Sequence, residues 1–187
     1  LNGADLELVD VITFGSPCQN LSIAGGRDGI NGEKSSLFFE AVRVIREMRE
    51  KTDGKYPRWC VWENVPGALS SSECRDFRQV LESLVRIKEE SAVVPMPDEG
   101  GRAEGSTSPE DTTVPQGRTR RAAKRGDGRH GKWLSAGEIL GDDYSLAWRI
   151  IDAQYHGVAQ RRRRVFVVVD FDGSRAGEVL FESESVS

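Results

Sequence analysis

The sequence has few cysteines, few histidines and no long apolar run, and each shortage excludes a class of protein. Its three cysteines, Cys18, Cys60 and Cys74, are an odd and sparse set, unlike the disulfide framework of a small secreted protein. No apolar run approaches the roughly 18 residues of a membrane helix, and no residues have the spacing of metal ligands. The chain also starts at Leu1 without a basic and apolar leader. We therefore expect a cytoplasmic protein that contacts no membrane and binds no metal.

A strong excess of charge of either sign is also missing. The 187 residues include 26 basic and 30 acidic ones, so the net charge of −4 neither favours nor excludes a nucleic-acid partner. The apolar content lies in the ordinary range for globular proteins. The length suits one domain with a core of its own. These values exclude a wholly disordered chain.

One stretch, residues 93–132, lacks Leu, Ile, Phe, Tyr and Trp and holds four of the seven prolines. Such a stretch cannot bury enough apolar surface to offset the entropy lost on ordering. We therefore predict a disordered insertion at 93–132, between a catalytic core at 1–92 and a terminal hairpin of the same domain at 133–187. The insertion is basic from Arg118 to Arg129 and could touch a polyanion, although a solvated loop is the favoured interpretation.

The remaining residues alternate between strand and helix patterns. Residues 8–14 and 58–62 are apolar runs typical of buried parallel strands. Helical spacing of apolar residues follows each run, and Ser70 and Glu73 have the spacing of a capping box before the second helix. Two further strands, at 144–152 and 165–171, have a short connection. The order predicts an α/β fold, a doubly wound sheet that ends in an antiparallel hairpin.

Reactive side chains follow the first two predicted strands. Cys18 lies in Gly15-Ser16-Pro17-Cys18-Gln19, and Glu63 begins Glu63-Asn64-Val65. Ligands of doubly wound sheets bind just beyond the carboxyl ends of the strands. A thiolate is a strong nucleophile and a nearby carboxyl can supply a proton. Alone, Cys18 would be read as a small packing residue and Glu63 as a surface carboxylate, but together they indicate a catalytic site.

Four adjacent arginines, residues 161–164, run directly into the last strand. Alternate residues of an extended chain face opposite sides, so Arg162 and Arg164 share a face with Gln160. Adjacent like charges repel one another unless an anion compensates them, and guanidinium groups suit phosphate or a polar ring edge. A solvated run of charge is the alternative interpretation.

Three motifs in this order, Gly15 to Gln19, Glu63-Asn64-Val65 and Gln160-x-Arg162-x-Arg164, closely resemble the DNA (cytosine-5) methyltransferase family. The Gly-rich loop at 20–36 that leads into Leu37-Phe38-Phe39 matches as well. The resemblance implies a partial Rossmann-like sheet as the fold. It also implies an enzyme with S-adenosylmethionine as cofactor and DNA as substrate. It also implies a bacterial or phage origin and a restriction endonuclease as a possible partner.

The resemblance also assigns roles to individual residues. It implies that Cys18 adds to carbon 6 of a flipped cytosine, that Glu63 binds ring nitrogen 3 and supplies a proton, and that Arg162 contacts the base carbonyl. The other implied roles are cofactor contacts by Pro17 and Leu37 and DNA contacts by Gln19, Ser22, Arg27, Gln160 and Arg164.

The family's aromatic-rich cofactor strand with its Gly-rich turn is missing, and so is its target-recognition region. We therefore expect this chain to be an inactive fragment whose open sheet edge favours self-association. Two alternatives remain open: methylation of cytosine in RNA such as tRNA, and a truncated non-catalytic module that binds nucleic acid through Arg161 to Arg164. The recognised DNA sequence stays open too.

Overall fold

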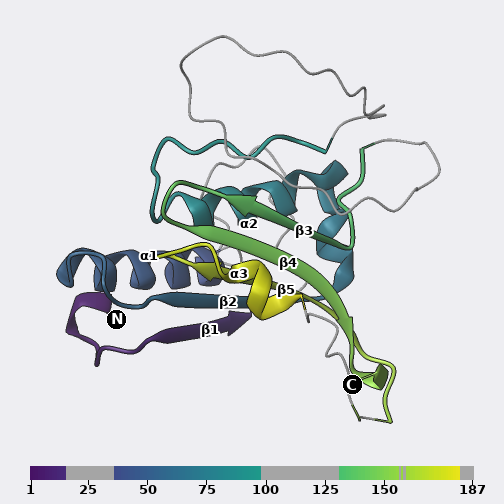
Figure 1. The fold of residues 1–187 in the computed structure, drawn as a ribbon, viewed down its shortest axis with the longest axis horizontal. Coiled ribbons are helices and arrows are strands. Elements are labelled where there is room, and N and C mark those ends of the chain that lie inside the picture. Colours follow the sequence, from purple (N-terminus) through teal and green to yellow (C-terminus); the bar gives the residue numbers. More distant parts are fainter. Residues whose placement is uncertain (16–35, 98–130, 156, 158, 182–187) are drawn as a thin grey trace.

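The computed structural model of the protein describes residues 1–15, 36–97, 131–155, 157 and 159–181. Within these residues a five-stranded sheet has the order β1-β2-β5-β4-β3 (Figure 1). Its strands are β1 (Val11–Gly15), β2 (Trp59–Asn64), β3 (Ala136–Leu140), β4 (Ser145–Asp152) and β5 (Arg163–Asp170). The first two strands pair in parallel and every other neighbouring pair is antiparallel. The expected α/β fold and its antiparallel hairpin, β4–β5, are confirmed.

Two helices cover one face of this sheet, and a short third helix covers part of the other. Helices α1 (Ser36–Lys51) and α2 (Arg75–Val85) pack their apolar residues against β2, β5 and β4 in the larger core. Helix α3 (Ala176–Leu180) packs against Ala147 and Val168 on the opposite face. The alternation of side chains along β2 separates the two faces, since Trp62 is fully buried under the helices while Glu63 points the other way. None of the described helices is long and apolar enough to cross a bilayer.

Aromatic side chains link the two halves of the chain in the larger core. The Phe77 ring of α2 lies 6.3 Å from Trp62 and 5.9 Å from Trp148 of β4, measured between ring centroids. Trp133 also contacts Trp148, at 5.7 Å, and its indole N–H donates to the carbonyl of Cys74. The residues before and after the 93–132 stretch therefore share one core.

Helix α2 does not begin at the predicted capping box. Residues 66–74 form two 3-10 turns, Pro66–Leu69 and Ser71–Cys74, and the helix begins only at Arg75. The Ser70 hydroxyl donates back to the carbonyl of Gly67 at 3.2 Å, within the preceding turn. The expectation was wrong because this local hydrogen bond takes the hydroxyl away from the helix.

The sequence analysis did not predict strand β3. It also placed Val94 in the disordered insertion, whereas this residue is buried. A Cβ on Gly137 in β3 would lie 2.2 Å from the Trp148 ring, so packing against tryptophan selects a residue of poor strand propensity. Val94 is only 3% exposed and belongs to the larger core, and its carbonyl accepts from Arg78 Nε. The packed chain therefore extends into the 93–132 stretch, of which residues 98–130 lie outside the described part.

Candidate functional site

The carboxyl ends of β1 and β2 lie side by side because the two strands are parallel and in register (Figure 1). Gly15, the last residue of β1, pairs with Glu63 of β2, and Glu63 pairs on its other side with Phe166 of β5. A Cβ on Gly15 would lie 3.2 Å from the Glu63 carbonyl oxygen and 3.4 Å from its Oε2. The glycine therefore leaves room beside the Glu63 carboxylate.

Two of the predicted arginines reach that carboxylate. Arg164 lies two residues before Phe166 and so shares a sheet face with Glu63. Its Nε is 2.8 Å from Glu63 Oε1, and Nη2 of Arg162 is 3.8 Å from the same oxygen. The Glu63 side chain is 35% exposed and the Arg162 side chain 54% exposed. The cluster is thus positioned by the sheet and still open to a ligand.

Such a cluster offers a planar, polar ligand both an acceptor and several donors. The carboxylate can accept from an amino group or a protonated ring nitrogen, and each guanidinium has N–H groups left over for carbonyl or phosphate oxygens. Exposed ion pairs of this kind contribute at most about 1 kcal/mol to stability. Stability alone therefore gives little reason for placing Arg162, Arg164 and Glu63 together.

Beyond the end of β2, the β4–β5 hairpin continues and carries the rest of the arginine run. Val165 is the last residue of this end of β5 that pairs with β2, whereas Arg163 and Arg164 pair only with β4. The Asp152 carboxylate accepts from the backbone N–H of Arg162 at 3.2 Å and so fixes the turn. The β4–β5 hairpin therefore extends past the end of β2 (Figure 1).

The hairpin also holds a hollow of about 630 Å³ that the sequence analysis missed. Arg149, Arg161 and Arg163 line it together with Tyr155, whose side chain is 79% exposed. An exposed aromatic ring among guanidinium groups is typical of surfaces that contact nucleic acid. The signal was available in the sequence, since Tyr155 stands six residues before the arginine run, but a lone tyrosine is more often a packing residue.

Of the other predicted site residues, the structure describes only Leu37 and Gln160. Leu37 lies in the first turn of α1 with 58% of its surface exposed, and Gln160 is exposed in the turn before β5. The remaining ones lie outside the described residues: Pro17, Cys18, Gln19, Ser22 and Arg27. The structure thus brings Glu63, Arg162 and Arg164 together and does not test the contacts of the nucleophile segment.

Neither described cysteine suits the role of a nucleophile. Cys60 is fully buried in the core, and this burial raises the pKa of its thiol above the usual range. Cys74 is buried as well, and its sulfur lies 3.2 Å from the carbonyl oxygen of Gly131. Among the described residues, no group of His, Cys, Asp and Glu side chains is arranged to hold a metal ion.

Comparison with known proteins finds similarity to DNA methyltransferases. Residues 1–88 match the family model of C-5 cytosine-specific DNA methylases. The chain is 39% identical, over 97% of its length, to a DNA N-6-adenine-methyltransferase of Escherichia phage P1, and this match covers 22% of the phage protein. It is 33% identical, over 56% of its length, to the DNA (cytosine-5-)-methyltransferase M.ApeKI of Aeropyrum pernix, again over 22% of that protein.

Two further similarities extend along the chain. The Type II methyltransferase M.Sau3AI of Staphylococcus aureus is 26% identical over 84% of this chain and 25% of its own length. The solved structure of the S. pombe Dnmt2 methyltransferase aligns with the whole chain and 41% of its own, with a TM-score of 0.47 and 13% identity. The chain therefore spans about a quarter or less of the curated relatives named here.

Proposed function

We propose that this chain, whose residues 1–88 match the family model of C-5 cytosine-specific DNA methylases, carries the catalytic residues for methylation of carbon 5 of cytosine in DNA. The observation that carries the proposal is the Glu63 carboxylate held 2.8 Å from Arg164 at the carboxyl ends of β1 and β2. Cys18 follows three residues after the end of β1. The proposal assigns Cys18 as the nucleophile, Glu63 as the acid and Arg162 as the arginine that contacts the base.

In the proposed reaction the Cys18 thiolate forms a bond to carbon 6 of the cytosine ring. The electrons of the carbon 5–carbon 6 double bond move to form a double bond between carbons 4 and 5. Those of the carbon 4–nitrogen 3 double bond move to nitrogen 3, where Glu63 supplies a proton. Arg162 donates to the ring carbonyl oxygen, while Arg164 holds the carboxylate in place. After methylation, carbon 5 loses its proton and the bond to Cys18 breaks. The base must first leave the duplex, because a stacked ring presents neither carbon.

S-adenosylmethionine would supply an electrophilic methyl group to this site. Leu37 fits a contact with the cofactor, since it is exposed in the first turn of α1, directly after the Gly-rich loop in the sequence. Pro17 is the other residue that we assign to this contact. We also propose that the active protein is longer than this chain, because the chain spans only 22% of its phage relative. We accordingly expect the 187-residue chain alone to bind the cofactor weakly.

Methylation of adenine is the second candidate, because the phage protein that is 39% identical over 97% of this chain is named for it. The matched part is 22% of that protein, so its name does not tell which segment acts on adenine. Attack by an exocyclic amino nitrogen requires no covalent bond from a cysteine to the ring. The Pro17-Cys18 dipeptide together with the Glu63–Arg164 pair therefore favours cytosine.

The deciding experiment incubates the longer protein that contains this chain with unmodified plasmid DNA and radiolabelled S-adenosylmethionine, and then separates the nucleosides. We expect 5-methyldeoxycytidine, and we expect DNA containing 5-fluorocytosine to remain covalently attached through Cys18. Label in N6-methyldeoxyadenosine that persists in Cys18→Ala would contradict the proposal. Transfer to tRNA in place of DNA would support the RNA alternative. DNA binding without any transfer would indicate a non-catalytic module.

A further inference from the structure

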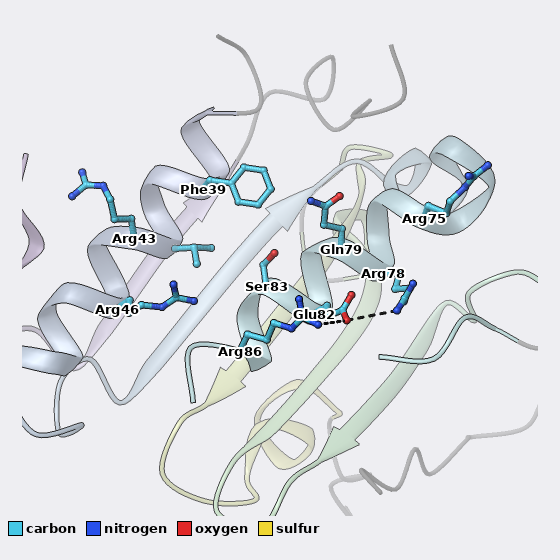
Figure 2. A pocket seen from close by; sticks show the side chains of 10 residues that line it. Phe39, Arg43, Arg46, Arg75, Arg78, Gln79, Glu82, Ser83 and Arg86 are labelled. Atoms are coloured by element: carbon cyan, nitrogen blue, oxygen red, sulfur yellow. Dashed lines mark hydrogen bonds and ion pairs between the residues drawn. The ribbon is translucent and has the colours of Figure 1, made fainter. Parts of the chain in front are cut away.

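A groove between α1 and α2 concentrates positive charge on the face of the sheet opposite Glu63 (Figure 2). It contains a hollow of about 630 Å³, with the half-buried Phe39 and the buried Val42 as its apolar lining. One carboxylate, Glu82, lines it. The lining guanidinium groups belong to Arg43, Arg46, Arg75, Arg78 and Arg86. Since the whole chain has a net charge of −4, this excess of positive charge is local.

Existing ion pairs compensate only part of this charge. Arg86 Nη2 lies 2.8 Å and Arg78 Nη2 lies 3.6 Å from the same oxygen, Glu82 Oε1, so two cations share one anion. Arg43 is paired with Glu40 and Glu47 on its own helix. Arg46 is exposed and has no hydrogen bond or ion pair within the described part of the chain.

The groove continues past this first hollow. Arg46 and Arg86 also line an adjoining hollow of about 610 Å³, to which Arg49 and Lys88 contribute positive charge and Glu50 and Glu90 negative charge. In Figure 2 the Arg46 side chain extends from α1 towards α2, whereas the Arg86 guanidinium turns along α2 towards Glu82. Arg86 is compensated by Glu82, whereas the charge of Arg46 faces the gap without a partner among the described residues and is free to bind an anion.

The lining side chains suit phosphate oxygens. Besides the guanidinium groups, Ser83 and Gln79 on α2 offer a hydroxyl and an amide donor to the hollow. Guanidinium groups bind phosphate through paired hydrogen bonds. Acidic protein partners are a poorer match, because stable protein interfaces concentrate their energy in buried aromatic and apolar anchors, and Phe39 is the one aromatic residue in the lining.

The arginines are also spread too widely for a single phosphate. From Arg75 to Arg86, α2 and its cap extend about 16 Å at 1.5 Å per residue. One DNA strand carries a phosphate about every 3.4 Å along the duplex axis, so this length corresponds to about five nucleotides. We propose that the groove between α1 and α2 binds the phosphate backbone of a nucleic acid, at a site separate from the Glu63 cluster.

The test measures fluorescence anisotropy of a labelled 16-base-pair DNA duplex titrated with the 187-residue chain at several salt concentrations. Arg46→Gln is the key variant, because Arg46 is unpaired in the described part and its loss breaks no ion pair. We expect several-fold weaker binding and a salt slope smaller by about one, as for the loss of one phosphate contact. Lys55→Gln, an exposed residue outside both hollows, is the matched control and should bind as the unmodified chain does.

The same loss should persist in a chain that also carries Arg162→Gln and Arg164→Gln, because the two sites lie on different faces. Several outcomes would overturn the proposal: unchanged binding in Arg46→Gln, an equal loss in Lys55→Gln, or disappearance of the effect in the Arg162/Arg164 background. Equally tight binding of a poly-glutamate peptide would point to an acidic protein instead. Equally tight binding of a free nucleoside monophosphate would point to a small-molecule site.

Discussion

Gly15 lies directly opposite Glu63 in the parallel pair of β1 and β2, so that a Cβ on Gly15 would come within 3.4 Å of Glu63 Oε2. The missing side chain leaves the carboxylate free to reach Arg164 Nε at 2.8 Å. The last residue of β1 therefore also shapes the surroundings of the Glu63 carboxylate.

Gly15→Val should impair catalysis while preserving the fold. A valine is favoured in strands, but its side chain would crowd Glu63 and weaken the contact with Arg164. We expect methyl transfer by the longer protein to fall by up to about 10²-fold, the loss that a misplacement of about 1 Å can cause. Circular dichroism and the melting temperature check the fold. Full activity in Gly15→Val would show that the position of Glu63 is not critical.

Glu63→Gln should keep the shape of the side chain and remove the proton donor. We expect turnover to fall by about 10²–10⁴-fold, the usual contribution of general acid catalysis, while DNA binding changes little. Glu178→Gln, which changes an exposed carboxylate on α3, is the matched control and should remain fully active. Wild-type turnover in Glu63→Gln would mean that the proton comes from another group.

The sequence predicted those parts of the fold and site that depend on local pattern. The strands ending near Gly15 and Glu63, and the hairpin bearing Arg162 and Arg164, follow from apolar runs and turns. Alternation predicted that Arg162 and Arg164 share a face, but their pairing with Glu63 became visible only in the structure. Strand β3 depends on contacts between distant residues, such as Gly137 against Trp148, which no local pattern reveals. The start of α2 was missed for a different reason, since the hydrogen bond from Ser70 to Gly67 competes with the capping box.

The stability of the fold should fall at alkaline pH. The Tyr144 hydroxyl donates to Glu89 Oε2 at 2.9 Å, and burial followed by this hydrogen bond raises its pKa. Burial raises the pKa of Cys60 too. In the unfolded chain these groups titrate near about pH 10 and 8.5, so the folded state holds more protons above those values. Their contribution is complete below the unfolded pKa values and is lost as pH rises through the folded ones.

Urea unfolding between pH 7 and 11 measures this loss. Tyr144→Phe should cost about 0.5–1.5 kcal/mol at pH 7 through the missing hydrogen bond. It should also make the decline above about pH 10 shallower, because phenylalanine does not titrate. A decline of the same steepness in Tyr144→Phe would assign the alkaline loss to other groups.

Deletion of residues 98–130 should leave the fold intact, whereas deletion of 93–132 should destabilise it. We propose that residues 1–92 and 133–187 form one catalytic domain, and the composition of the intervening stretch offers almost no apolar surface for a core. Val94 is the exception, because it is 3% exposed in the larger core. Loss of a buried valine costs roughly 1.5–3 kcal/mol of transfer free energy. Chemical denaturation of both deletions, each closed with the same short Gly-Ser linker, compares them directly. Equal stabilities would show that Val94 contributes nothing.

The 187-residue chain should self-associate through the β1 side of its sheet. Strand β1 is the outermost strand of the described sheet, and three apolar residues in or just before it are 40–47% exposed: Leu8, Val9 and Val11. An unpaired strand edge with apolar neighbours is a template for pairing with another chain, and a charged residue placed there opposes it. We therefore expect sedimentation velocity to show concentration-dependent association that Val11→Lys reduces. Val179→Lys, at an exposed valine on α3, is the control and should associate as the unmodified chain does. A monomer at all concentrations would mean that this edge is protected, and an equal effect of both lysines would mean that net charge alone governs the association.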